Sequence, residues 1–265
     1  MAEMHSYATN SRRQATILGA IALASAFAAI GTYYSFEWIS ARLKPQLDIQ
    51  AFGWLIGPLT LTGYYAIFLA IFEKYSWRAL SETPHLGGTW VGCTRPDYQG
   101  WPHLSVLKIE QTWLTIFVEL SHFWRGKDDT EWNLSRRLGR DQSVTAALSS
   151  RRVNEANFTF CYQHKGIKAD QPDFDGTMSL IVDLAGKQLQ GKYYTNRPFV
   201  FDERVCSYGH VMLVKQSDKL LSAEESLKSF VGDEQLLQHI VEAVANMAGR
   251  EPNYRLGSHR RSHGE

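Results

Sequence analysis

Aromatic and hydrogen-bonding side chains of the kinds that hold a nucleotide recur through the middle of the chain. The set is Trp90, Gln111, Trp113, Thr115, Tyr162, Thr177, Tyr193, Thr195 and Arg197. Aromatic faces stack on bases, and an Arg guanidinium can form paired hydrogen bonds with phosphate oxygens. Each residue taken singly is also typical of the core or rim of a β-domain, and Arg197 of a solvated loop. We treat the set as a candidate ligand-binding site.

The familiar signatures of catalysis and metal binding are missing from the sequence. It has no P-loop, no G-x-G-x-x-G fingerprint, no G-x-S-x-G elbow and no H-E-x-x-H pair. Four central histidines have no metal-ligand spacing and are interpreted as structural or surface residues: His103, His122, His164 and His210. The acidic stretch 168–176 lacks the Glu of a calcium loop and is interpreted as a solvated turn. We expect no enzymatic activity, no metal and no cofactor.

Charge balance and cysteine spacing limit the partners and the compartment. The 28 Lys and Arg residues nearly balance the 27 Asp and Glu residues, so the chain lacks the basic excess that duplex nucleic acid requires. Its cysteines, Cys93, Cys161 and Cys206, form neither a C-x-x-C pair nor an even disulfide set. This pattern favours a reducing compartment, and we expect the part outside the membrane to be cytoplasmic.

The elements that must position the candidate site show the period-two alternation of β-strands. About eight short segments show it, without a useful helix between them: 89–94, 104–110, 112–121, 144–149, 157–163, 176–182, 188–195 and 209–214. Residues 183–187 are typical of a hairpin turn, and residues 125–142 of a polar excursion between strands. We predict an all-β domain, an eight-stranded antiparallel barrel that can hold one small ligand, with a β-sandwich as the alternative.

Two apolar stretches precede the β-rich segment and predict transmembrane helices. Residues 15–36 and 49–72 carry no charge, and each is long enough to cross a hydrocarbon core of about 30 Å. Basic residues in the outer flanks outnumber those in the connecting loop, which favours both termini on the inner side. Small residues at helical spacing in the first stretch suit either packing on the second helix or self-association of subunits. The rival interpretation is a signal peptide, because Arg-Arg precedes an A-x-A-like site at 24–26.

An amphipathic helix is predicted after the last strand. Ser222 with Glu225 resembles a capping box, and Asp233 can cap a helix whose apolar residues recur over 236–247. This helix suits packing on the barrel, plugging one of its ends, oligomerisation or contact with the membrane surface. A polar, basic tail that we expect to be disordered follows it. The predicted divisions are an N-terminal tail with two transmembrane helices (1–80), a barrel domain (81–217), and the helix with the tail (218–265).

The order of short motifs after the two apolar stretches resembles that of a known family. The motifs are L-G-G-T-W at 86–90, K-I-E-Q-T-W at 108–113, F-D-G-T at 174–177, L-Q-G-K-Y-Y-T-N-R at 189–197 and G-H-V at 209–211. Together they are similar to the two-transmembrane, β-strand-rich effectors of bacterial CBASS anti-phage systems, the CD-NTase-associated family with an eight-stranded barrel. The resemblance spans residues 12–216.

This resemblance implies that the barrel binds a cyclic dinucleotide made by a partner CD-NTase, and that the protein lies in the bacterial inner membrane with the barrel cytoplasmic. Binding would promote homo-oligomerisation through the transmembrane helices, disruption of the lipid bilayer, and arrest or death of the infected cell. The candidate residues would supply stacking surfaces and phosphate donors. A membrane-anchored lipocalin-like or fatty-acid-binding barrel is the alternative. A membrane enzyme is a third hypothesis, favoured if His and carboxylate side chains converge.

Overall fold

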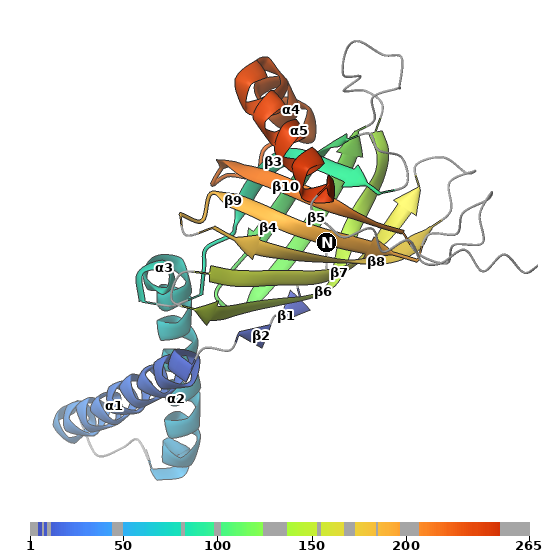
Figure 1. Ribbon diagram of the computed structural model, residues 1–265. Coiled ribbons are helices and arrows are strands. Elements are labelled where there is room, and N and C mark those ends of the chain that lie inside the picture. The colour runs from blue at the N-terminus through green and yellow to red at the C-terminus, as the bar shows by residue number, and fades with distance from the viewer. Residues whose placement is uncertain are drawn as a thin grey trace, which may run out of the picture.

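The computed structural model describes residues 5–6, 8–9, 12–43, 50–80, 83–97, 102–123, 137–152, 155–166, 173–183, 185–196 and 207–249. Within these ranges, N-terminal helices lead into a β-barrel, and two further helices follow it (Figure 1). Arg197, residues 125–136 of the predicted excursion and the basic tail lie outside the described residues. The predictions made for them therefore stay predictions.

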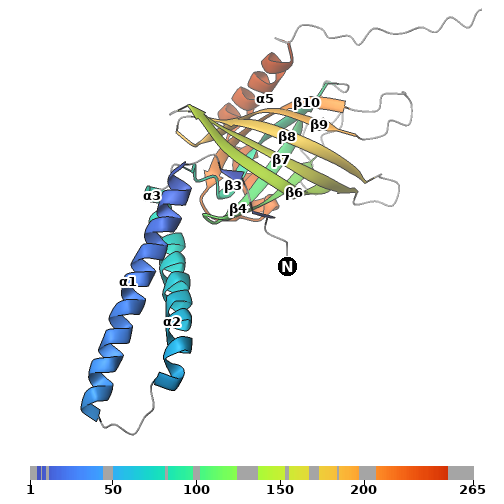
Figure 2. The same cartoon turned by 90° about the horizontal axis from the view of Figure 1, so that it is seen from below.

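Long helices form from both apolar stretches. The helices α1 (Arg12–Leu43) and α2 (Gln50–Ile71) are followed by the π-helix η1 (Phe72–Ser76) and by α3 (Trp77–Leu80). Helices α1 and α2 lie side by side (Figure 2), and the hydroxyls of Thr32 and Tyr64 are 2.6 Å apart across their contact. Among the described helices, the segment Gln14–Ile39 is the one that is long and apolar enough to cross a membrane. The second span stays a prediction.

Eight antiparallel strands close into a barrel, which confirms the predicted all-β architecture. They are β3 (Gly88–Pro96), β4 (His103–Gln111), β5 (Thr115–Phe123), β6 (Arg137–Arg152), β7 (Glu155–Gly166), β8 (Phe174–Val182), β9 (Gln188–Thr195) and β10 (Ser207–Ser217). The strands pair in the order β5-β4-β3-β10-β9-β8-β7-β6, and pairing of β5 with β6 closes the ring. This closure excludes the sandwich alternative.

Two parts of the sheet differ from the prediction. Strand β6 begins at Arg137, so residues 137–142 belong to a strand and the predicted excursion was wrong there. The polarity of this part misleads because Arg140 is exposed while Asp141 is buried in a polar region of the interior. The short strands β1 (His5–Ser6) and β2 (Ala8–Thr9) also pair with the barrel. Strands of two residues are too short to leave a periodic pattern in a sequence, so periodicity does not predict them.

Apolar side chains fill the half of the barrel interior nearer to α2. Inward-facing strand residues form one buried cluster here, with Trp90, Phe158 and Phe160 among the largest members. At this end Asp183 Oδ1 accepts hydrogen bonds from the backbone N–H groups of Lys187 and Gln188, which confirms the predicted hairpin turn. The opposite end is where the interior becomes polar.

Two C-terminal helices cover the outside of the barrel. Helices α4 (Ala223–Gly232) and α5 (Glu234–Gly249) pack their apolar faces on β3, β4 and β10. Ser222 Oγ accepts a hydrogen bond from the backbone N–H of Glu225, and Asp233 Oδ1 accepts one from that of Leu236. Both predicted caps are confirmed. Of the proposed roles for the amphipathic helix, packing on the outer face of the barrel is the one observed.

Candidate functional site

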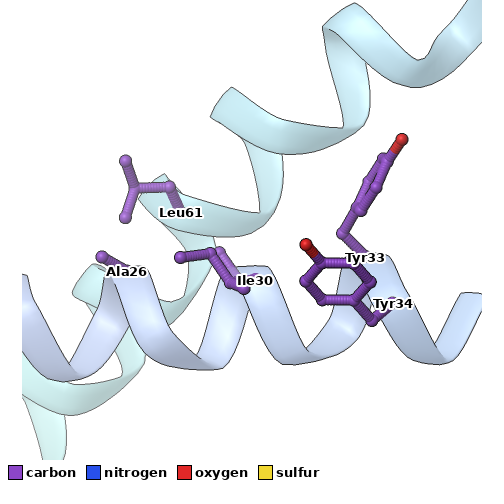
Figure 3. Close-up of a pocket in the computed structure, with 6 residues that line it drawn as sticks. Ala26, Ile30, Tyr33, Tyr34 and Leu61 are labelled. Atoms are coloured by element: carbon purple, nitrogen blue, oxygen red, sulfur yellow. The ribbon is translucent and has the colours of Figure 1, made fainter.

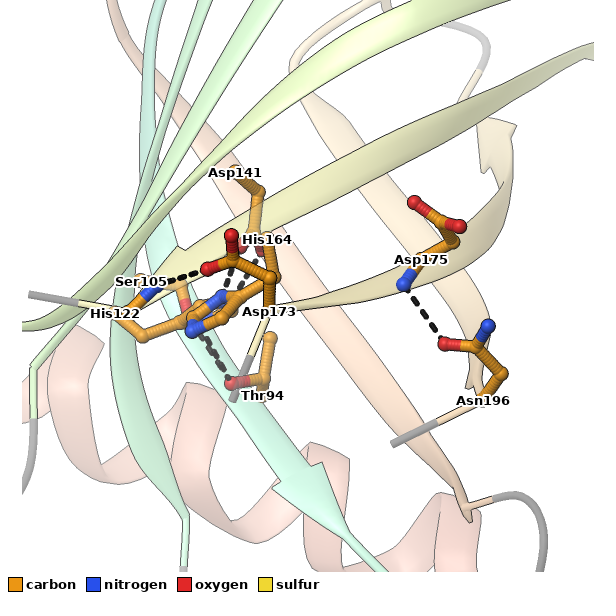
Figure 4. A network of polar contacts seen from close by, with 9 residues as sticks. Thr94, Ser105, His122, Asp141, His164, Asp173, Asp175 and Asn196 are labelled. Atoms are coloured by element: carbon orange, nitrogen blue, oxygen red, sulfur yellow. Dashed lines mark hydrogen bonds and ion pairs between the residues drawn. The ribbon is translucent and has the colours of Figure 1, made fainter. Parts of the chain in front are cut away.

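A buried carboxylate lies at the centre of the polar end of the barrel interior. Asp141 on β6 has only 2% of its side chain exposed. Its Oδ2 atom is 3.0 Å from Nε2 of His122 on β5, and its Oδ1 atom is 2.5 Å from Nδ1 of His164 on β7. The two imidazoles thus converge on one carboxylate (Figure 4). Both histidines, interpreted from the sequence as structural or surface residues, belong to a polar cluster inside the barrel.

Two hydroxyl groups extend this cluster across the neighbouring strands. Ser105 Oγ on β4 is 3.0 Å from Nδ1 of His122, and Thr94 Oγ1 on β3 is 3.0 Å from Ser105 Oγ. The connected side chains therefore come from β3, β4, β5, β6 and β7, which are consecutive around the barrel because β5 pairs with β6. We call Thr94, Ser105, His122, Asp141 and His164 the interior network.

Aromatic rings and glycines shape the walls around the interior network. The Phe174 ring stacks on the imidazole of His164, with centroids 4.1 Å apart and planes 12° from parallel. A Cβ atom on Gly139 would lie 2.0 Å from Cε1 of His164, and one on Gly176 would lie 2.3 Å from Cζ of Tyr162. The two rings therefore lie directly over glycine backbone, where any larger residue would displace them. The sequence thus specifies the position of both rings.

Electrostatics keep the carboxylate ionised and the phenol neutral. Burial by itself would raise the pKa of Asp141, but the charge and hydrogen bonds of His122 and His164 hold it below its usual value. Burial, followed by the nearby Asp141 charge and Tyr193, raises the pKa of Tyr162 well above its usual value. Tyr162 therefore offers a neutral hydroxyl near a buried anion. Such a set can accept hydrogen bonds from N–H groups and donate them to carbonyl, ring-nitrogen or phosphate acceptors.

Three residues of the interior network have the bonding order of a serine hydrolase relay. Ser105 contacts one ring nitrogen of His122, and Asp141 contacts the other. The Ser105 side chain, however, is completely buried and also hydrogen-bonded to Thr94. This arrangement presents no exposed nucleophile. The convergence of His and carboxylate that would favour a membrane enzyme is thus present, in a network whose Ser105 is fully buried.

Several of the predicted ligand residues lie near the polar end. Tyr162 points into the barrel and is buried, Thr195 is buried at the end of β9, and Tyr193 packs half-buried against the interior cluster. Asn196 follows Thr195, and its Oδ1 accepts a hydrogen bond from the backbone N–H of Asp175 at 2.7 Å (Figure 4). This contact fixes the chain just before Arg197, which lies outside the described residues.

Other predicted ligand residues lie at the end nearer to the helices. Trp90 is fully buried and donates its indole N–H to the Leu86 carbonyl. Gln111 Oε1 accepts from the backbone N–H groups of Leu86 and Gly87. These side chains hold the segment that enters the barrel, and the structure does not bring them to the interior network.

The junction between helix and barrel contains two more of the predicted residues. The Trp113 ring meets Phe72 of η1 edge-on, with centroids 4.7 Å apart, and it is buried in a cluster with residues of α1 and α2. Thr115 bonds to Thr112 in the turn beside it, with the two hydroxyls 2.9 Å apart.

Thr177 is on β8, where its hydroxyl lies 3.6 Å from Cys161 Sγ. On that strand the residues flanking it, Gly176 and Met178, point inward, so Thr177 faces outward.

Strand parity is the signal that could have identified the missed residues. His122 lies two and four residues after Leu120 and Val118, which point into the barrel, and His164 lies two residues after Tyr162, so each histidine faces the same side of its strand as these inward residues. The same alternation that predicted the barrel therefore places both imidazoles inside it. Asp141 was harder to find, because its part of β6 was interpreted as an excursion.

A hollow lies between α1 and α2. Its volume is about 410 Å³, and it is lined by Ala26, Ala29, Ile30, Tyr33, Tyr34 and Leu61 (Figure 3). The lining is mostly apolar and open, which suits lipid chains or a neighbouring helix and offers little to a charged ligand. The interior network is therefore the stronger candidate site for a polar molecule.

Metal binding has no support in the part of the chain that the structure describes. No group of three or more His, Cys, Asp or Glu side chains there is arranged to hold a metal ion. The convergence of His122, Asp141 and His164 is explained by their mutual hydrogen bonds.

The sequence matches no protein-family model and no curated protein.

Proposed function

We propose that this protein is a membrane-anchored effector of bacterial CBASS defence whose barrel binds a cyclic dinucleotide. The interior network is the observation that carries the proposal. Burying one carboxylate, two imidazoles and two hydroxyls inside a small barrel is costly in stability, and an apolar core would serve a mere spacer better. A polar interior of this kind suits a ligand with many hydrogen-bonding groups.

The chemistry of the polar end fits nucleobases. Asp141 can accept hydrogen bonds from amino and imino N–H groups, and the hydroxyls of Tyr162 and Thr195 can pair with ring nitrogens or carbonyls. Phe174, already stacked on His164, and Tyr193 provide faces on which bases can stack. A cyclic dinucleotide carries two bases and two phosphates, and Arg197, immediately after the fixed Asn196, is the predicted phosphate donor.

The N-terminal helices would supply the effector activity. Helix α1 exposes large apolar side chains, with Phe27 67% and Leu23 60% exposed, as expected of a surface that faces lipid or another subunit. The Trp113–Phe72 contact joins the barrel to these helices, so a change in the barrel has a physical route to them. The ligand would shift assembly by binding the assembled state more tightly than the free one. The assembled helices would then disrupt the inner membrane.

The test is a thermal-shift screen of the full-length protein in lipid nanodiscs. The panel comprises cyclic dinucleotides, cyclic trinucleotides, linear dinucleotides and oleate. A ligand at one hundred times its Kd stabilises the folded state by about 2.7 kcal/mol, which for a protein of this size raises the Tm by roughly 5 to 10 °C. We expect a cyclic dinucleotide to give this shift. Analysis of that nucleotide after incubation should recover it intact.

Matched variants locate the response. Tyr162→Phe and His164→Gln remove groups at the polar end and should reduce the shift, whereas Tyr194→Phe, on the exposed neighbour of Tyr193, should leave it unchanged. Stabilisation by oleate alone would replace the proposal with the apolar-carrier alternative. Cleavage of the bound nucleotide would instead support the enzyme hypothesis and the Ser105–His122–Asp141 relay.

A further inference from the structure

The strand pair that closes the barrel is joined along only part of its length. Strands β5 and β6 pair directly from Glu119 with Gln142 to Phe123 with Arg137. Toward the helices the two strands separate, and β6 has a register irregularity between Ser143 and Thr145. At this point Ser143 Oγ accepts the hydrogen bond of the Val118 N–H at 3.0 Å. We call the interval between the separated strands the open seam.

The N-terminal segment of the chain occupies the open seam. Strand β1 pairs antiparallel with β5, with His5 opposite Ile116 and Ser6 opposite Thr115. Strand β2 pairs in parallel with β6 and places Ala8 opposite Ala147. The two short strands therefore bridge β5 and β6, and Figure 1 shows β1 and β2 beside β6 on the side of the barrel nearer to α1. Backbone groups that β5 and β6 would otherwise leave exposed find partners here.

Helix α1 begins immediately after this segment. Only Asn10 and Ser11 separate Thr9 from Arg12, the first residue of α1. An extended chain covers at most about 3.6 Å per residue, so the start of the helix is held within roughly 11 Å of the seam. Any movement of β2 out of the seam therefore changes where α1 can begin relative to the barrel.

The interior network ties the joined part of the same seam. His122 is on β5 and Asp141 is on β6, and their hydrogen bond of 3.0 Å crosses the closing strand pair inside the barrel. A ligand that bonds to either side chain acts directly on this cross-seam contact. The ligand site and the N-terminal segment thus share one structural element, although they lie toward opposite ends of it.

We propose that β1 and β2 are a latch: they hold the seam closed in the free protein, and ligand binding releases them, which frees α1 to assemble. The ligand arm of this inference rests on the proposed function. Two-residue strands contribute few hydrogen bonds, so they belong to the parts of a fold that open most easily. The latch gives the barrel a second connection to the helices besides the Trp113–Phe72 contact.

A disulfide across the latch tests its position and its role. Ala8→Cys with Ala147→Cys joins directly opposed positions in a background that also carries Cys161→Ser and Cys206→Ser, leaving only the fully buried Cys93. The control pair is Ala8→Cys with Val144→Cys, because Val144 is 58% exposed on the same strand but lies three residues farther along it. Mild oxidation of the free protein should cross-link the first pair and spare the control.

The functional readout is dye release from vesicles that contain the full-length protein. The cross-linked protein should still give the thermal shift with cyclic dinucleotide but lose the ligand-induced release, and reduction of the disulfide should restore it. Failure of the first pair to cross-link, or normal release from the cross-linked protein, would overturn the latch.

A ligand-free arm separates the latch from the proposed function. Deletion of residues 2–9 should cause a loss of hydrogen-exchange protection in the segments 115–118 and 146–149, with 158–162 on β7 as the internal control. Unchanged protection at the seam would refute the latch even if a ligand binds. If no nucleotide binds but the deletion exposes the seam, the proposed function fails and the structural role of the segment stands.

Discussion

Replacing Asp141 by Asn should destabilise the barrel strongly although it hardly changes the shape of the side chain. The carboxylate accepts hydrogen bonds from two imidazoles in a site where only 2% of its side chain is exposed. A hydrogen bond to a charged group contributes about 1.5 to 3 kcal/mol, and removing one partner of a buried ionic network costs about 3 to 5 kcal/mol. The amide keeps one acceptor oxygen and points an NH2 group at the other ring. We expect a loss of about 3 kcal/mol.

The destabilisation should depend on pH in a definite direction. The folded-state pKa of Asp141 lies below the ordinary value of 3.8, so folding favours the ionised form. The stability contributed by this group is complete well above pH 4 and is lost as the pH falls through the folded-state pKa, below about 4. Asn does not titrate. The difference in stability between wild type and Asp141→Asn should therefore be full at pH 7 and shrink below pH 4.

Thermal unfolding, monitored by tryptophan fluorescence, measures the difference in stability between wild type and Asp141→Asn. For 150 to 250 residues each kcal/mol shifts the Tm by roughly 2 to 4 °C, so Asp141→Asn should lower the Tm by about 6 to 12 °C at pH 7. The control is Asp175→Asn, an exposed residue that contacts Asn196 through its backbone, and it should change the Tm by less than about 2 °C. A stability of Asp141→Asn equal to wild type at pH 7 would refute the argument.

Three further changes probe other parts of the structure. Gly176→Ala places a Cβ 2.3 Å from the Tyr162 ring and should lower the free energy of unfolding by about 1 to 3 kcal/mol, measured by chemical denaturation. In a Tyr162→Ala background the same Gly176→Ala change should lower it much less, because the clashing ring is gone. Trp113→Ala removes the ring packed on Phe72 and should lower the free energy of unfolding by about 3 to 5 kcal/mol. It should also speed proteolysis between the helices and the barrel, and an unchanged rate of proteolysis would contradict the proposed junction. Burial, with the charges of Arg78 and Lys215, lowers the pKa of His85 to about 4, so wild type should lose stability as the pH falls from 6.5 to 4, and His85→Gln should make that slope shallower.

The parts of the fold that follow from local rules were predictable from the sequence. Alternation of side chains indicated the eight strands, and Ser222 and Asp233 marked the helix starts, because caps and pleats depend on residues close together in the chain. The turn at Asp183 follows from the same kind of local chemistry. Long-range closure of β5 on β6 and insertion of the N-terminal segment leave no such local trace.

The candidate site was only partly predictable, for a physical reason. Of the candidate residues, Tyr162, Tyr193 and Thr195 lie near the polar end of the barrel. Trp90 and Gln111 instead hold the chain in place by hydrogen bonds to the segment at Leu86. A Trp or Gln serves a core or a ligand with the same atoms, and only three-dimensional position separates the two roles. His122 and His164 were interpreted from the sequence as structural or surface residues, and the structure places both inside the barrel, where ionisable side chains are seldom found.

The most direct test of the account is the imidazole NMR spectrum of the full-length protein, labelled at histidine and held in nanodiscs, during titration with the cyclic dinucleotide that gives the thermal shift. His122→Gln and His164→Gln assign the two rings. Both ring signals should move in a saturable manner with the same Kd, while that of His239, on the exposed surface of α5, stays in place. Saturable binding with His122 and His164 unmoved would contradict the claim that the interior network is the ligand site.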